Sequence, residues 1–157
     1  MSNQYLVSGK KRSESSSVMT ELVLPNDANQ IGNLLGGRLL HYIDIAGALA
    51  AMRHSGGLVA TKIIDPVTFR SPIKVGEIVE LTSYVTWTGT TSIETAVEVY
   101  AESTLTGGRR FISKAYLVFV AIDLDGVKRA VPALIPGNDA ERADCAAGEL
   151  RQRARLG

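Results

Sequence analysis

A single aspartate stands inside the most apolar helical segment of the sequence. Asp44 lies between Ile43 and Ile45, in a run built otherwise from Leu, Ile, Ala and Gly. A carboxylate in such surroundings is costly unless it is paired or lies near water. One chemical role for it is that of a general base or a nucleophile. The alternatives are a helix position that faces solvent at an edge of the domain, or a pair with His41 one turn earlier.

A Gly-Gly pair stands where the same helix is predicted to begin. Gly36 and Gly37 precede the helical pattern, and the first N–H groups of a helix have no partner within the helix and favour negative charge. Glycine lets a carbonyl approach the backbone because it has no Cβ. The pair is therefore a candidate oxyanion site for acyl transfer. The alternative is that both glycines only make the turn into the helix.

The spacing of these groups favours a site shared between two chains. Seven residues separate Gly37 from Asp44, which is about 10 Å of helix rise. One reacting carbon cannot touch both groups of the same helix, so the hypothesis predicts a symmetric dimer with two composite sites. Asn29 precedes the glycines and is a third candidate, because its amide can face the same carbonyl or a water molecule. A plain turn residue is the alternative for Asn29.

The remaining pattern predicts the elements that position these residues. Apolar positions at spacings of three and four predict a helix over 38–54, ended by Gly56-Gly57. Alternating or continuous apolar runs predict strands over 17–24, 58–70, 77–87, 92–102 and 109–123, and a second, basic helix is predicted over about 138–155. Tight turns between the strands favour an α+β fold in which an antiparallel sheet curls around the first helix.

The predicted strands carry two details of side-chain placement. Val79, Leu81, Val85 and Trp87 alternate onto one face of their strand, and Glu94, Glu98 and Glu102 alternate onto the polar face of the next. Pro66 predicts a bulge or an edge position within 58–70, because proline lacks a backbone N–H.

Composition limits the remaining choices. The chain of 157 residues fits one domain, with a flexible tail over 1–16, a main domain over 17–135 and a helical extension over 136–157. A net charge of +1 favours neither nucleic acid nor membrane surfaces as partners. Cys145 is the only cysteine, which excludes an intramolecular disulfide, argues against a zinc cluster and favours a reducing cytoplasm. We expect no signal peptide and no membrane span.

Three stretches together resemble a known family. They are LPNDANQIGNLLGGRLLHYIDIAGALAAMRH, VATKIIDPVTFRSPIKVGEIVEL and WTGTTSIETAVEV, and they are similar to the acyl-CoA thioesterases of the hotdog fold over roughly Met19 to Pro132. The resemblance implies a curved antiparallel sheet wrapped around one long central helix, dimers that assemble as trimers of dimers, and a role in fatty acid metabolism. It implies Asp44 as the catalytic carboxylate, Asn29 acting across the dimer interface, and N–H groups of Gly36 and Gly37 polarising the thioester.

The resemblance also implies a region that binds coenzyme A. Its G-T-T-S turn matches Gly89 to Ser92, with Thr90, Thr91 and Ser92 as contacts. Its F-x-x-P-x-x-x-G run matches Phe69, Pro72 and Gly76. Leu35 stands where relatives usually carry an aromatic residue or His, which bears on acyl preference. Six cations are candidates for the phosphates of coenzyme A: Arg70, Lys74, Arg109, Arg110, Lys128 and Arg129.

The function expected from these residues is hydrolysis of acyl-CoA to a free acid and coenzyme A, without a metal or redox cofactor. Asp44 would activate water or attack directly to give a mixed anhydride. An enzymatic alternative is a hotdog hydratase or dehydratase acting on acyl-CoA or acyl carrier protein, which would need a histidine base such as His41. For His54 we expect capping or packing instead. A non-catalytic acyl-CoA-binding module is the other alternative. We expect an exposed C-terminal helix, with assembly or coenzyme A binding as alternatives.

Overall fold

The computed structural model describes residues 8–157, and its elements follow the predicted order. They are β1 (Lys10–Lys11), η1 (Arg12–Glu14), β2 (Ser17–Leu22), η2 (Pro25–Asp27), α1 (Gly36–Ser55), β3 (Val59–Ile64), β4 (Ile78–Thr88), β5 (Ser92–Glu102), β6 (Arg109–Ala121), β7 (Leu134–Ile135) and α2 (Asp139–Leu156). Within the predicted tail over 1–16, residues 10–14 form β1 and η1, while residues 1–7 lie outside the described part. No helix among the described residues is long and apolar enough to cross a membrane.

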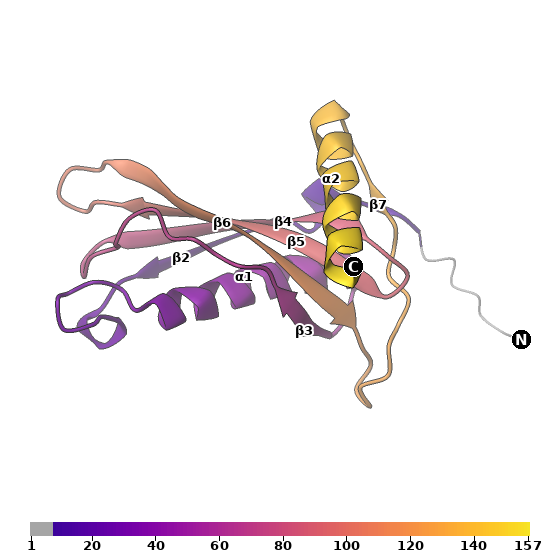
Figure 1. Cartoon of the computed structure of the whole chain (residues 1–157), viewed down its shortest axis with the longest axis horizontal. Coiled ribbons are helices and arrows are strands. Elements are labelled where there is room, and N and C mark those ends of the chain that lie inside the picture. Colours follow the sequence, from indigo (N-terminus) through magenta and orange to yellow (C-terminus); the bar gives the residue numbers. More distant parts are fainter. Residues whose placement is uncertain (1–7) are drawn as a thin grey trace, which may run out of the picture.

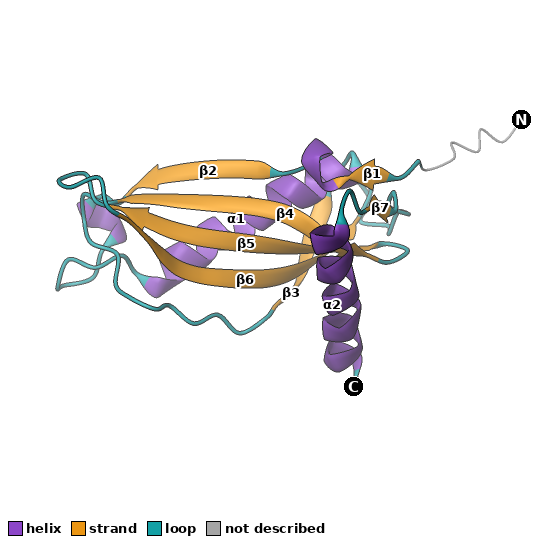
Figure 2. Cartoon of the chain, turned by 90° about the horizontal axis from the view of Figure 1, so that it is seen from above, coloured by secondary structure: helices purple, strands orange, loops and turns teal. Residues whose placement is uncertain are grey.

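Five antiparallel strands form one curved sheet along α1 (Figure 1). Their spatial order is β2-β4-β5-β6-β3, so β2 and β3 are the two edges. Figure 2 shows α1 behind the strands and α2 crossing their outer face near one end of the sheet. A short parallel pair, β1 with β7, lies beside that end. The hotdog arrangement and the C-terminal helix are thereby confirmed.

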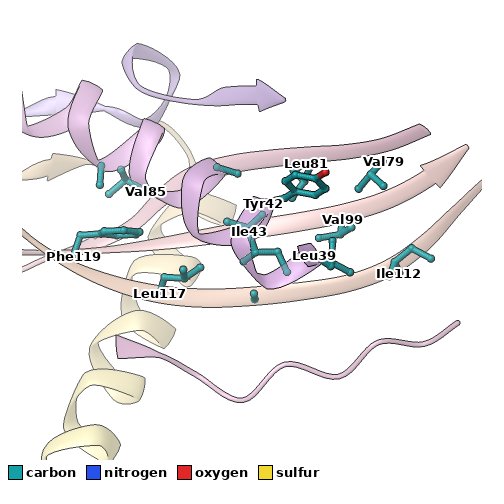
Figure 3. Packing of buried hydrophobic residues seen from close by; sticks show 14 of the residues in the cluster. Leu39, Tyr42, Ile43, Val79, Leu81, Val85, Val99, Ile112, Leu117 and Phe119 are labelled. Atoms are coloured by element: carbon teal, nitrogen blue, oxygen red, sulfur yellow. The ribbon is translucent and has the colours of Figure 1, made fainter. Parts of the chain in front are cut away.

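Small residues let α1 lie close against the inner face of the sheet. Tyr42, Ile43 and Ala46 are buried there, and Figure 3 shows Leu39, Tyr42 and Ile43 among buried side chains of the strands. A Cβ placed on Gly47 would lie 2.8 Å from Thr95 Oγ1 and 3.1 Å from the Phe119 ring. A larger residue at this crossing would have to shift the Thr95 hydroxyl and the Phe119 ring.

The strand predicted over 58–70 is only half as long in the structure. β3 ends at Ile64, and the chain then runs without regular structure to β4, because β3 and β4 lie on different sides of β5 and β6 and must be joined across the sheet. The predicted edge position is confirmed. The irregularity in pairing falls between Thr61 and Ile63, however, and not at Pro66.

The outer face of the sheet differs from the prediction at two positions. The pairing of β4 with β5 shifts between Val85 and Trp87. Trp87 therefore leaves the face it was predicted to share with Val85, and its Nε1 donates to Glu149 of α2 at 2.9 Å. Glu94 does lie on the face opposite the core, but its side chain is fully buried. Most of α2 is exposed or half-exposed, as expected, but its inner side covers this part of the sheet and buries Gly148.

Candidate active site at the start of the central helix

The first turn of α1 has backbone donors that find no acceptor among residues 8–157. Leu35 is the N-cap residue and supplies no side-chain hydrogen bond, and the N–H of Leu39 is the first to bond back into the helix, to Leu35 O at 3.0 Å. The N–H groups of Gly36 and Gly37 precede that bond. A Cβ on Gly37 would meet no atom within 4 Å. A ligand oxygen can therefore approach these donors at the positive end of the helix dipole.

Five of the predicted site residues line one cavity beside this turn. The cavity has a volume of about 340 Å³, and its walls include Asn29, Gly36, Phe69, Arg70 and Pro72. Two segments supply them: the loop that leads into α1 and the irregular stretch after β3. Gly37 and Leu35 line a neighbouring hollow of about 380 Å³ with Arg38 and His41. Both predicted glycines thus border open space.

Asn29 is a turn residue whose amide N–H groups remain free to donate. Its Oδ1 accepts from the N–H groups of Ile31 at 3.1 Å and Asn33 at 3.0 Å, which holds the loop in a turn. Its Nδ2 has no hydrogen-bond partner among residues 8–157. The amide oxygen is therefore occupied by the loop, whereas the amide N–H groups can donate to a ligand or water in the cavity.

Asp44 accepts a hydrogen bond from a residue that the sequence analysis did not identify. Thr61 of β3 donates its hydroxyl to Asp44 Oδ1 at 2.8 Å. Asp44 is half-buried and does not line the cavity of its own chain, so it lies apart from the Gly36–Asn29 group as the helix spacing predicted. His41 is exposed and forms no ion pair with Asp44 in the described part of the chain. Thr61 carries no motif of its own, and only its position opposite α1 identifies it.

The G-T-T-S turn lies away from the cavity within one chain. Thr90 accepts from the N–H of Val131 at 2.9 Å and Thr91 accepts from the N–H of Ala121 at 3.0 Å, both through backbone carbonyls. The turn therefore belongs to the end of the sheet where α1 stops, not to the end where α1 starts. The structure does not bring Thr90, Thr91 and Ser92 together with the other predicted residues of the same chain.

The candidate cations differ in how far they are committed to other groups. Arg110 donates to both carboxylate oxygens of Glu77, at 2.6 and 2.9 Å, and to Pro72 O at 2.7 Å. Hydrogen bonds from Arg110 lower the pKa of Glu77. Arg70 stacks over the Phe111 ring at 4.8 Å and lines the cavity. Arg70 is thus available to a ligand, whereas Arg110 supports the wall of the site.

The two histidines lie in different environments, because His41 is exposed beside Gly37 and His54 is buried. His54 is fully buried near the end of α1, and its Nε2 lies 2.7 Å from Pro132 O. Burial lowers the pKa of His54, which favours the neutral ring. Neither histidine forms an ion pair with a carboxylate in the described residues, and His54 packs at the helix end as expected.

A family model and several known proteins match the sequence of this chain. A model of the thioesterase superfamily matches residues 31–107. The chain is 40% identical over 128 residues to YkhA of Bacillus subtilis, named an uncharacterized acyl-CoA thioester hydrolase, covering 82% of this chain and 74% of that protein. It is 32% identical over 125 residues to the cytosolic acyl coenzyme A thioester hydrolase of Mus musculus, covering 74% of this chain but only 33% of the mouse protein.

Solved structures extend the likeness over nearly the whole fold. A hexameric acyl-CoA thioesterase solved without ligand superposes with a TM-score of 0.90 at 37% identity, covering 96% of each chain. An acyl-CoA hydrolase of Staphylococcus aureus, solved with butyryl coenzyme A and coenzyme A, superposes with a TM-score of 0.85 at 33% identity, covering 94% of this chain and 90% of that one. Alanine mutants of that hydrolase at an aspartate, an asparagine and a threonine are also known. The chain belongs to the acyl-CoA thioester hydrolases of the thioesterase superfamily.

Proposed function

We propose that this protein hydrolyses acyl-CoA thioesters to a carboxylic acid and coenzyme A. The observation that carries the proposal is the pair of accessible N–H donors at Gly36 and Gly37, next to a cavity of about 340 Å³. Donors directed at a developing oxyanion stabilise the tetrahedral intermediate of acyl transfer. The S. aureus relative with butyryl coenzyme A bound supports the substrate class.

The proposed site is completed by a second copy of the chain. Asp44 does not line the cavity beside the glycines of its own chain, and about 10 Å of helix rise separates it from Gly37. Asp44 is bonded to Thr61 on the edge strand β3, where another chain has access. Hexameric relatives support an oligomer. We therefore assign Gly36, Gly37 and Asn29 to one protomer and Asp44 to its partner, in dimers assembled as trimers of dimers.

The reaction can be described with the groups of this chain and water. The thioester carbonyl accepts hydrogen bonds from Gly37 and Gly36, and the amide of Asn29 orients the carbonyl or the water. Asp44 takes a proton from a water molecule as that water attacks the carbonyl carbon. Alternatively, Asp44 attacks that carbon itself to give a mixed anhydride, and water then hydrolyses the anhydride to the free acid and restores the carboxylate. In either case the C–S bond breaks, and the sulfur of coenzyme A leaves and takes up a proton. Thr61 holds one oxygen of Asp44 and leaves the other for the reaction.

The proposed substrate contacts extend beyond the reacting groups. Hydrolysis is redox-neutral, and the described side chains suffice for it, so we assign no metal or redox cofactor. Phe69, Pro72 and Arg70 would contact the substrate near the cavity, and Leu35 would border the acyl group. Thr90, Thr91 and Ser92 can contribute only from another part of the oligomer. A single cysteine and a net charge of +1 suit a cytoplasmic enzyme with neither nucleic acid nor membrane as a partner.

The test measures thiol release from a series of saturated acyl-CoAs of increasing chain length. The wild type is expected to release coenzyme A, and Asp44→Asn is expected to lower kcat at least about 100-fold, since it removes the base or nucleophile. Asp139→Asn is the matched control, because Asp139 is an exposed carboxylate of α2, and its activity should equal the wild type. Near-full hydrolysis by folded Asp44→Asn would contradict the assignment of Asp44. Full activity in a strict monomer would contradict the composite site.

A further inference from the structure

One buried charge cluster lies outside the site just described. Glu94 of β5 is fully buried on the outer face of the sheet, beneath α2. Arg151 donates to its two oxygens at 3.0 and 2.7 Å, and Arg155 donates to Oε2 at 2.7 Å. The hydroxyl of Thr86 donates to Oε1 at 2.6 Å. A buried carboxylate with this many donors holds α2 firmly against the sheet, because any lost partner would leave charge uncompensated.

Arg155 has a second carboxylate partner, on a different element. Its guanidinium donates to Asp65 Oδ1 at 2.9 Å and to Asp65 Oδ2 at 2.7 Å. Asp65 is the residue directly after β3, and its own N–H donates to Tyr116 O of β6 at 3.0 Å. The side chain of Arg155 is only 9% exposed. Arg155 therefore ties the last turn of α2 to the point where β3 ends.

The end of β3 bears on the proposed site, because β3 contains Thr61, the hydrogen-bond donor to Asp44. β3 is an edge strand, and among residues 8–157 its one strand partner is β6. Thr61 pairs with Phe119, but the register shifts between Thr61 and Ile63, so the ladder is interrupted directly after Thr61. The bidentate bond from Arg155 to Asp65 fixes the strand on the far side of this irregularity.

We infer that Arg155 is a positioning residue for hydrolysis: by holding the end of β3, it keeps Thr61 against Asp44. This inference rests on the proposed function. The residues after Asp65 have anchors of their own, because Ser113 Oγ donates to Thr68 O at 2.7 Å and the Arg70 N–H donates to Ile112 O at 3.0 Å. Loss of the Arg155 contact should therefore act on kcat, through the Thr61–Asp44 pair, more than on KM, through the cavity wall.

Arg151 provides a matched control on the same helix. It lies one turn before Arg155, donates to the same Glu94 and stacks over the Tyr116 ring at 3.7 Å. It forms no bond with Asp65. Arg151→Gln weakens the attachment of α2 alone, whereas Arg155→Gln weakens that attachment and also releases the end of β3.

The experiment compares wild type, Arg151→Gln, Arg155→Gln and Asp65→Asn as full-length oligomers, with kcat and KM for one good acyl-CoA and the melting temperature of each. Both arginine variants should melt at lower temperature. Arg155→Gln and Asp65→Asn should each lower kcat about tenfold more than Arg151→Gln does, with KM changed less than about twofold. Asp65→Asn leaves both arginines paired with Glu94, so it decides the question if Arg155→Gln does not fold.

Two outcomes would overturn the inference while leaving the proposed function intact. One is an equal kcat in Arg151→Gln and Asp65→Asn. The other is a rise of KM at unchanged kcat in Asp65→Asn, which would place the effect at the cavity wall. A wild type that releases no thiol from any acyl-CoA would instead contradict the proposed function itself, so the two failures are distinguishable.

Discussion

The two ends of α1 are built in opposite ways. At its start, the N-cap Leu35 offers no side-chain acceptor and Gly37 borders open space. At its end, Gly56 adopts the left-handed conformation with φ of 73° and its N–H donates to Met52 O at 2.8 Å. His54 is buried against Pro132 O at the same end. The N-terminal end of α1 thus has backbone N–H groups available to a ligand, whereas carbonyl groups at the C-terminal end accept hydrogen bonds from the chain itself.

The C-terminal end of α1 therefore contributes to stability, whereas its N-terminal end is available for catalysis. Helix ends with capped groups add stability, typically by about 0.5–2 kcal/mol per cap. An uncapped start forgoes that contribution but keeps donors for a ligand charge. The following variants test this contrast, beginning with the largest expected effect.

Gly37→Ala should damage the reaction and spare the fold. No atom lies within 4 Å of the added methyl group, and alanine is the better helix former. The methyl would instead occupy the space through which the thioester oxygen approaches, so we expect kcat/KM to fall by about 10- to 100-fold. Thiol-release kinetics and thermal melting measure the two quantities.

Gly47→Ala is the opposing control on the same helix. Its methyl would meet Thr95 Oγ1 at 2.8 Å, so stability should fall by about 1–3 kcal/mol, with kcat per folded molecule retained. An unchanged kcat/KM in Gly37→Ala would show that the open start of α1 is not used in catalysis.

Lowering the pH should reduce the stability of the protein through His54, which is buried near the C-terminal end of α1. Burial lowers the pKa of His54 below the ordinary value of about 6.5. As the pH falls below that value, His54 becomes protonated in the unfolded chain but stays neutral in the folded protein. The free energy of unfolding therefore decreases. His54→Gln should cost about 1 kcal/mol at pH 7.5 and should lose less stability than the wild type between pH 7.5 and 5.5. Urea unfolding at both pH values gives the comparison, and parallel losses in the two proteins would refute it.

The smallest effect concerns a cation at the same end. Lys10 donates its ammonium group to Arg53 O at 3.0 Å, in the last turn of α1. Lys10→Ala should lower the free energy of unfolding by about 0.5 kcal/mol at low salt, because a cation at a helix C-terminus interacts favourably with its dipole. Lys11→Ala, one residue along the chain, should have no such effect. A loss that persists in 1 M salt would point to packing instead of charge.

The parts of the site that the sequence could predict are those with local signals. The Gly-Gly pair, the aspartate in an apolar run and the Gly56 stop are all visible within one helix, and the alternation of β4 and β5 predicts the hairpin. Thr61 had no such signal, since it meets Asp44 from 17 residues away.

The errors arise where a distant partner or an irregular strand pairing overrides the simple alternation of a strand. The burial of Glu94 depends on Arg151, 57 residues later, and Asp65 at the end of β3 pairs with Arg155, 90 residues later. The turn of Trp87 toward α2 follows from the irregular pairing after Val85. Periodicity reports only which neighbours alternate, and it carries no information about partners so distant in the chain.

The spacing of Arg151 and Arg155 has a consequence for which dockings of α2 the protein can adopt. If the helix slid by one turn, about 5.4 Å along its axis, Arg151 would replace Arg155 between Asp65 and Glu94. Ala147 would then stand where Arg151 had been, and Glu94 would lose one of its two cations beneath a covering helix. Removing one partner from a buried ion pair costs about 3–5 kcal/mol, which disfavours this shifted position of α2. Glu94 thus favours the observed axial position of α2 over the position shifted by one helical turn.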